Sequence, residues 1–404
     1  ANRRSDEVGY AYLWDLDTNA YPSSSAWGLI LPTEEALKAD ANHANNDNTF
    51  GVWRARTAAF NKIYYDPTVH YEPWIGQDED NNDFVDADPN AVRLDPVDPD
   101  DTFPLLDLHS YKASGVPVWA NKGGTSDVAV TDLYIPFYYT TSVANPQETD
   151  TWDEKIVIVE ENAPFPGGPN RDDCRDDGNP LECSYAQEIQ NFANWFQYYR
   201  SREFVTKGSM GSVIAEVQDI RVGYETISAT TSEDVAEMND LYSEGEKKEL
   251  LDNVYAVDSY GGTPMRQALA RASRILGCQV GSDCPALPDP EGQCQQNFVL
   301  MFTDGYWNGG AGVSANTDIN GDGEFDGGRY ADDVRATLAD TAMEYYENDL
   351  FPSVDDGVPI GIRDVEGAPE GTFDGVDAMH QHIKTYAIAF GVTGTIDPAE
   401  PRNT

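Results

Sequence analysis

The chain is organised around one stretch, Asn297-Phe-Val-Leu-Met-Phe-Thr-Asp-Gly-Tyr-Trp-Asn-Gly-Gly310. Its apolar run from Phe298 to Phe302 is short and unbroken, which predicts a strand buried on both faces, as in a parallel sheet. The run ends at Thr303-Asp304-Gly305. Ligands of open α/β sheets bind just past the carboxyl ends of strands. Asp304 is therefore a candidate ligand-binding carboxylate, and the alternative is that Thr-Asp-Gly is only a turn.

A second stretch, Tyr260-Gly-Gly-Thr-Pro-Met265, follows a predicted strand over Val254–Val257. It opens a predicted helix, because apolar residues recur with helical spacing after it. We expect Pro264 at the first helical position and Thr263 at the N-cap. Capping alone would explain Thr263.

These two stretches resemble two of the three metal-binding loops of a von Willebrand factor A (vWA) domain. The resemblance implies that Thr263 and Asp304 help to hold a divalent cation, Mg²⁺ or a similar ion, at the top of the sheet. Hard cations prefer oxygen ligands, which both side chains offer.

The rest of the chain predicts two parts. Strands alternate with helices over residues 181–404, which predicts an α/β, vWA-like and Rossmann-like core: a mostly parallel sheet flanked by helices. The longest helical pattern runs from Ser184 to about Val217, and another runs from Tyr330 to about Asn348. Residues 1–180 depart from this alternation, and we expect an elaboration with an aromatic motif, loops and a small additional β-sheet.

The charge of the chain excludes one class of partner. Asp and Glu number 71 against 26 Lys and Arg, which gives a formal net charge of −45. Nucleic acid is excluded, because phosphate binding needs a basic surface. Such charge suits a surface that binds cations or a protein adapted to salty water. No segment is apolar for long enough to span a membrane, and no signal peptide is visible, so we expect a mature or truncated chain.

The five cysteines indicate an oxidising compartment with disulfides. Cys174 and Cys183 are expected to close one short loop. Cys278, Cys284 and Cys294 allow only one internal pair, and their spacing leaves that pair undecided. The odd cysteine then has a partner elsewhere or stays free.

Several further segments sharpen the resemblance to one family, the PilY-type tip adhesins of bacterial type IV pili. They are Ala59-Phe-Asn-Lys-Ile-Tyr-Tyr-Asp-Pro-Thr-Val-His-Tyr-Glu-Pro-Trp74, Asn191-Phe-Ala-Asn-Trp-Phe-Gln-Tyr-Tyr-Arg-Ser-Arg202, Phe302-Thr-Asp-Gly-Tyr-Trp-Asn308, Phe325-Asp-Gly-Gly-Arg-Tyr-Ala-Asp332 and Leu338-Ala-Asp-Thr-Ala-Met-Glu-Tyr-Tyr346. The resemblance implies a secreted, surface-exposed protein at the pilus tip, exported through the periplasm. It also implies roles in adhesion, pilus biogenesis and surface sensing, with minor pilins and a host or abiotic surface as partners.

One part of the vWA pattern is missing. The first metal loop of such domains reads Asp-x-Ser-x-Ser, and this sequence does not contain it. We expect that the loop lies upstream of Ala1 or has been lost. Thr263 and Asp304 would then be half of a site.

A second metal candidate is a calcium loop. Its oxygen-bearing residues alternate as in the start of an EF-hand loop, at Asp318, Asn320, Asp322, Glu324 and Asp326. Alternating oxygens wrap one Ca²⁺, and Gly323 permits the sharp turn. Arg329 occupies the position of the usual bidentate Glu, so that ligand must come from elsewhere. The alternative is an ordinary polar loop in an acidic protein.

These observations favour a non-catalytic function. The sequence contains no Gly-x-Ser-x-Gly motif and no phosphate-binding glycine loop ahead of a helix. We expect His380 and His382 to be a surface pair. The favoured hypothesis is a metal-dependent adhesin module. The alternatives are a structural cap on minor pilins, whose metals only brace loops, and, more remotely, a secreted hydrolase.

Overall fold

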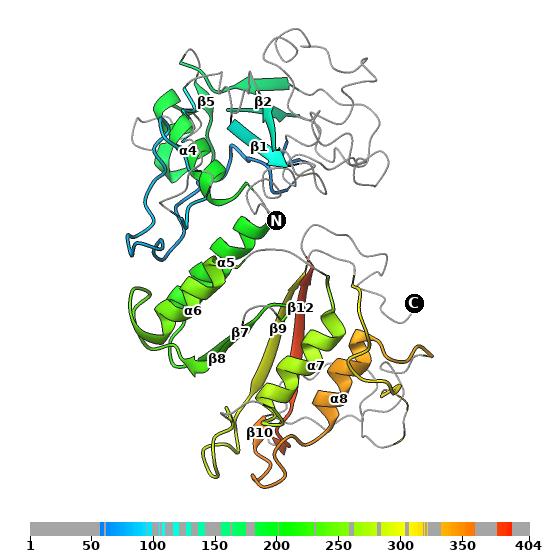
Figure 1. Ribbon diagram of the computed structural model, residues 1–404. Coiled ribbons are helices and arrows are strands. Elements are labelled where there is room, and N and C mark those ends of the chain that lie inside the picture. Colours follow the sequence, from blue (N-terminus) through cyan, green and yellow to red (C-terminus); the bar gives the residue numbers. More distant parts are fainter. Residues whose placement is uncertain are drawn as a thin grey trace. The chain divides into compact units, whose positions relative to one another are not determined.

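A computed structural model describes residues 57–59, 62–93, 95–98, 105, 107–109, 116–120, 127–130, 136–141, 155–161, 164–174, 182–200, 202–229, 232–257, 262–280, 284–303, 307–317, 319, 321, 333–359 and 378–389. The chain forms two compact units, which we call the first and the second unit (Figure 1). The first comprises Ala1–Ile220 and Glu237–Ser259, and the second comprises Arg221–Ala236 and Tyr260–Thr404. The predicted domain boundary at residue 180 therefore differs from the first boundary between these compact units, which follows Ile220.

The first unit combines short antiparallel strand pairs with helices. The strand pairs are β1 (Val116–Ala120) with β2 (Asp127–Val130), β3 (Phe137–Thr140) with β4 (Lys155–Ile158), and β5 (Phe165–Pro166) with β6 (Glu182–Cys183). The helices are η4 (Asp172–Cys174), α4 (Tyr185–Tyr198), α5 (Arg202–Glu216) and α6 (Gly245–Tyr255).

Two predictions about these helices are wrong. The single helix expected from Ser184 is two, because Tyr199 leaves the helical conformation with φ −136°. The strand expected over Val254–Val257 is instead the end of α6. There Leu250, Leu251, Val254 and Tyr255 are all buried. They follow helical spacing, and a four-residue apolar run taken alone cannot distinguish the two structures.

Helix α4 forms the centre of the first unit through its side-chain amides. Asn191 Oδ1 accepts a hydrogen bond from the amide of Tyr71 (2.7 Å), and its Nδ2 donates to the carbonyl of Val69 (2.8 Å). Asn194 donates to the carbonyl of Tyr71 (2.8 Å) and accepts from the amide of Ala87 (2.8 Å). These amides supply the partners that a neighbouring strand would otherwise give to buried backbone groups.

Aromatic side chains fill the space between this helix and the rest of the first unit. Trp74 stacks on Tyr255 with ring centroids 5.1 Å apart. A Cβ at Gly208 of α5 would lie 2.6 Å from the Trp74 indole nitrogen, so only glycine fits there. Tyr64 and Tyr65 are fully buried. The aromatic motif is therefore part of the main core of this unit.

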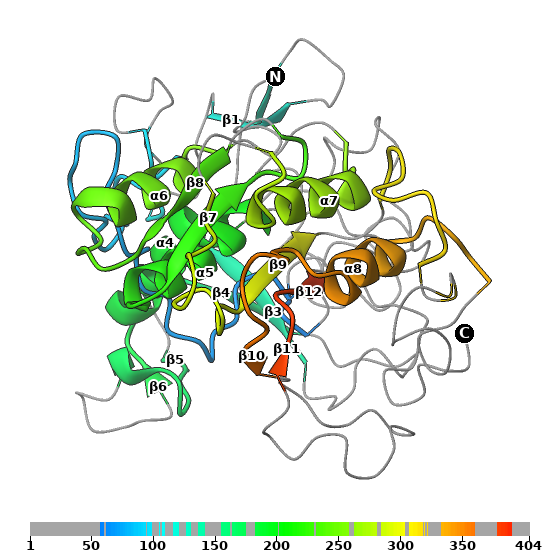
Figure 2. The ribbon, with the colours of Figure 1, turned by 90° about the horizontal axis from the view of Figure 1, so that it is seen from below.

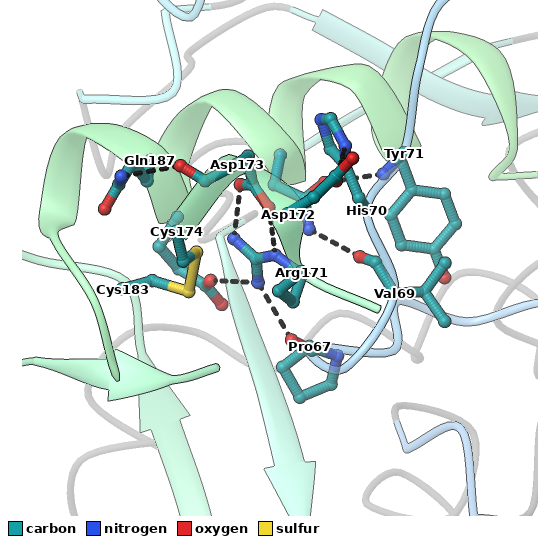
Figure 3. Close-up of polar contacts among 12 residues, drawn as sticks. Pro67, Val69, His70, Tyr71, Arg171, Asp172, Asp173, Cys174, Cys183 and Gln187 are labelled. Carbon is teal, nitrogen blue, oxygen red and sulfur yellow. Dashed lines mark hydrogen bonds and ion pairs between the residues drawn. A yellow bond between two sulfur atoms is a disulfide. The ribbon is translucent and has the colours of Figure 1, made fainter. Parts of the chain in front are cut away.

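Arg171 ties the disulfide-bonded loop to the same core (Figure 3). It is fully buried and donates to both carboxylate oxygens of Asp173 (2.9 Å each), to Glu188 Oε2 (2.8 Å) and to the carbonyl of Pro67 (2.8 Å). A disulfide joins Cys174 to Cys183 beside it. A buried charge needs such partners, because desolvation without them is costly.

The second unit contains the parallel pair that the sequence predicted. Its elements are β7 (Arg221–Glu225), β8 (Ser232–Glu237), α7 (Met265–Leu276), β9 (Asn297–Thr303), α8 (Leu338–Glu347), β10 (Val358–Pro359), β11 (Ala378–Met379) and β12 (Ile383–Ala389). Strands β9 and β12 pair in parallel over their whole length, from Asn297 opposite Ile383 to Thr303 opposite Ala389. Helices α7 and α8 lie beside this pair (Figures 1 and 2).

The burial predicted for β9 is only half right. Met301 is buried against Met265 and Leu269 of α7. Phe298 and Leu300 on the other face are 51% and 54% exposed. Strand side chains alternate between faces, and α7 and α8 cover one face of β9. The described residues thus form a mixed α/β structure with one parallel pair, and a complete vWA fold remains a prediction.

Other features bear on earlier expectations. Cys278 pairs with Cys284, and Cys294 is a free, exposed cysteine. His382 is buried, so His380 and His382 are not simply a surface pair. Across the described residues, no helix is both long and apolar enough to cross a membrane.

Candidate functional site

Thr263 lies at the end of the loop that leads into α7. The N-cap of α7 is Pro264, and no side-chain hydrogen bond caps the helix. The predicted capping role of Thr263 is therefore wrong, since the helix begins one residue later than expected. Capping does not explain a threonine at this position.

Asn308 fixes the Thr263 loop against the loop that follows β9. The amide of Thr263 donates to Asn308 Oδ1 (3.0 Å), and the amide of Asn308 donates back to the carbonyl of Thr263 (2.9 Å). Strand β9 ends at Thr303, five residues before Asn308. The two stretches that the sequence analysis connected are thus in direct contact.

Two glycines permit this close approach. A Cβ at Gly262 would lie 2.6 Å from Asn308 Oδ1. Gly309 has φ +88°, and a Cβ there would lie 2.9 Å from Pro264 Cβ. Both distances are shorter than atoms tolerate, and a positive φ disfavours any side chain at Gly309.

Arg266 of α7 holds the far side of the same loop. Its guanidinium lies 3.6 Å from the centroid of the Trp307 ring, and it donates to the carbonyls of Gly309 (3.2 Å) and Ala336 (2.5 Å). Cation–π contact and hydrogen bonds together restrict the segment after β9. No role for Arg266 or Asn308 was predictable from the sequence. Asn308 ended a quoted motif, but no spacing rule marked it as a partner of Thr263.

Asp304 lies outside the described residues, and so do Asp318, Asn320, Asp322, Glu324 and Asp326 of the predicted calcium loop. The structure describes the residues that border the first predicted site, and we call them its frame. They are Thr263 before α7, Thr303 at the end of β9, and Trp307 and Asn308, the first described residues after Asp304. The described oxygen-bearing side chains of this frame are those of Thr263, Thr303 and Asn308, and oxygen atoms are the ligands that hard divalent cations prefer.

Comparison with known proteins gives three curated matches, each named type IV pilus biogenesis factor PilY1, from Pseudomonas aeruginosa. The PAK strain protein is 26% identical over 240 residues, 54% of this chain and 21% of its own length. The PAO1 protein is 24% identical over 237 residues, covering 52% and 20%. The UCBPP-PA14 protein is 30% identical over 179 residues, covering 41% and 15%. The matched part thus spans about a fifth of these relatives or less.

No family model matches the chain, and no solved structure matches it. The resemblance to PilY-type proteins that the motifs predicted is confirmed by the three curated matches. A vWA domain has no such support from comparison and remains a prediction.

Proposed function

We propose that this chain is part of a type IV pilus biogenesis factor and acts by binding rather than by catalysis. A divalent cation held by Thr263 and Asp304 would coordinate an acidic group on a partner. Its remaining positions would be filled by water or by a further loop. The partner would be a surface ligand met at the pilus tip, and the same module would contribute to adhesion, pilus assembly and surface sensing.

One observation carries this proposal: the reciprocal hydrogen bonds between Thr263 and Asn308. They hold the loop before α7 against Asn308 in the loop after β9, which supports a cation shared between these two loops. Hydroxyl and carboxylate ligands leave open positions on a hard cation, and a partner's carboxylate can fill one of them. The relatives named PilY1 support the pilus context of the proposal.

The test compares attachment with piliation in the bacterium that encodes this chain. Strains would carry Thr263→Val, which keeps the shape but removes the hydroxyl, Asp304→Ala, or the matched control Thr263→Ser. We expect normal numbers of surface pili in all three strains. Attachment in the presence of Mg²⁺ should fall about tenfold or more for Thr263→Val and Asp304→Ala, and stay near wild type for Thr263→Ser. Attachment at the wild-type level in Thr263→Val and Asp304→Ala would contradict metal-dependent adhesion, and loss of pili in these strains without loss of attachment would favour the structural cap.

A further inference from the structure

His70 and Asp172 meet in the first unit, far from each other in the sequence. Val69 and Asn170 form a parallel bridge, and the amide of His70 donates to the carbonyl of Asn170 (3.1 Å). This pairing brings His70 Nδ1 to 2.6 Å from Asp172 Oδ1 (Figure 3). Nitrogen or oxygen atoms of His70, Asp172 and Asp173 all lie within 4.8 Å of one another. In the described part of the chain, no other three His, Cys, Asp or Glu residues converge in this way.

The backbone that carries these side chains is held from several directions. Arg171, next to Asp172 in the chain, donates hydrogen bonds to Asp173, Glu188 and the carbonyl of Pro67. The disulfide at Cys174 restrains the chain directly after Asp173. Ligand positions built on such a restrained backbone need little rearrangement to receive an ion.

The space beside this group is open and polar. A cavity of about 320 Å³ is lined by His70, Glu72, Pro169, Asn170 and Asp172. Glu72 adds a further carboxylate there. The charge of Arg171 is shared between Asp173 and Glu188, so the negative charge at this cavity exceeds the positive charge. A cation entering the cavity is favoured by that field.

We propose that His70, Asp172 and Asp173 bind one transition-metal dication of the zinc type. Both carboxylate oxygens of Asp173 accept hydrogen bonds from Arg171, so Asp173 binds the ion through the oxygen lone pairs that these bonds leave open. Imidazole nitrogen with carboxylate oxygen is a common ligand set for Zn²⁺, whereas Ca²⁺ and Mg²⁺ prefer oxygen alone. Donors bound to one Zn²⁺ at about 2.0–2.2 Å lie roughly 3.3 Å apart. His70 Nδ1 and Asp172 Oδ1 are closer than this, at 2.6 Å, and Asp172, 68% exposed, can rotate to widen the spacing.

This site is independent of the Thr263 site, which lies in the other unit. The ion would join two segments about a hundred residues apart in sequence. Its remaining coordination positions would face the cavity and be open to water or to a partner's donor atom.

The chain offers a matched control. His109 Nδ1 lies 3.3 Å from Asp107 Oδ1, also in the first unit and also near the surface. No third carboxylate, cysteine or histidine completes that pair among the described residues. A histidine–aspartate pair alone is a poor zinc site, so His109→Ala should leave zinc affinity unchanged.

The test is calorimetric titration of the whole chain with ZnCl₂. A Cys294→Ser background removes the free thiol, and millimolar Ca²⁺ occupies diffuse acidic sites. We expect one zinc ion per chain. His70→Ala and Asp172→Asn should each weaken its binding by about tenfold or more, whereas His109→Ala should change it less than twofold. Asp172→Asn keeps the side-chain shape, and circular dichroism checks that each variant is folded.

A second readout identifies the ligands. Co²⁺ bound in place of Zn²⁺ should give visible absorption bands that disappear in His70→Ala and persist in Thr263→Val. Absence of zinc binding by the parent chain would overturn the proposal. Equal affinity in a folded His70→Ala variant would overturn it as well.

Discussion

The two units hold their chains together by different means. In the first unit, amide and aromatic side chains of α4 bind segments that have little regular secondary structure, such as the one around Tyr71. In the second unit, β9 and β12 satisfy each other's backbone, and α7 and α8 cover one face with apolar contacts. An extended chain thus needs no sheet to be ordered, provided that side chains pair its buried N–H and C=O groups.

The two units should therefore be destabilised by different kinds of change. The first unit depends on buried polar groups and fully buried rings, whose loss or ionisation is expensive. The second depends on one covered face of a strand pair, whose other face tolerates change. Four perturbations should therefore distinguish the two units.

Raising the pH should unfold the first unit before the second. Burial raises the pKa of Tyr199 to about 12 and raises those of five other tyrosines of this unit: Tyr65, Tyr71, Tyr138, Tyr198 and Tyr255. A raised folded-state pKa gives stability that is complete below about pH 10 and is lost as pH rises through the folded value. Each unit of a raised pKa corresponds to about 1.4 kcal/mol, so ionising these tyrosines in the folded first unit is costly.

The second unit provides the comparison for this titration. Burial also raises the pKa of Tyr345 in this unit. Phenolate absorbance and hydrogen exchange, followed together from neutral pH upward, should show first-unit peptides opening first. Simultaneous opening of both units would contradict the contrast.

Asn191→Ala should destabilise the first unit by about 2–5 kcal/mol. The substitution removes the hydrogen bonds of Asn191 with the amide of Tyr71 and the carbonyl of Val69. Each buried group left without a hydrogen bond costs about 1–3 kcal/mol. The control is Asn253→Ala on α6, where the side chain donates to the exposed carbonyl of Glu249 in its own helix (2.9 Å), and the change should be within about 0.5 kcal/mol. Hydrogen exchange at Tyr71 measures the difference, and equal protection in the two variants would argue against the role of α4.

Within the second unit, the two faces of β9 should respond unequally. Met301→Ala removes a buried contact with Met265 and Leu269 and should cost about 2–4 kcal/mol. Leu300→Ala, on the exposed face, should cost less than about 1 kcal/mol. Urea unfolding of the two variants makes the comparison. A large loss from Leu300→Ala would mean that this face is covered in solution.

The smallest expected effect concerns two helix caps. Ser184 and Thr337 each form a capping box, with Gln187 and Asp340 respectively. Alanine at either position should cost about 1 kcal/mol. The loss of stability should be larger at Thr337. Its partner Asp340 is buried and also accepts a hydrogen bond from the amide of Thr317 (2.8 Å). Thermal unfolding checks the order, and Thr337→Ser should restore most of the loss.

The sequence predicted the second unit better than the first, for a physical reason. Apolar periodicity marks elements that pack by burial, so α7 and β9 could be located from it. It could not show which face of β9 stays exposed, because that depends on elements distant in sequence. The amides of α4 are polar residues on a helix, and no pattern distinguishes an Asn that binds a remote carbonyl from one that faces water.

The candidate sites divide in the same way. Local motifs indicated Thr263 and Asp304, whereas the reciprocal pairing with Asn308 needed the fold. His70 and Asp172 are about a hundred residues apart, and each looked like an ordinary loop residue. Only the bridge between Val69 and Asn170 brings them together.

The most direct test of the proposed function is Mn²⁺ binding, as a stand-in for Mg²⁺, followed by electron paramagnetic resonance on the whole chain. We predict one site that is stronger than the diffuse acidic background. It should weaken about tenfold or more in Thr263→Val and Asp304→Ala and persist in Thr263→Ser and His70→Ala. Identical Mn²⁺ binding in all these variants and the parent chain would contradict a cation shared by Thr263 and Asp304.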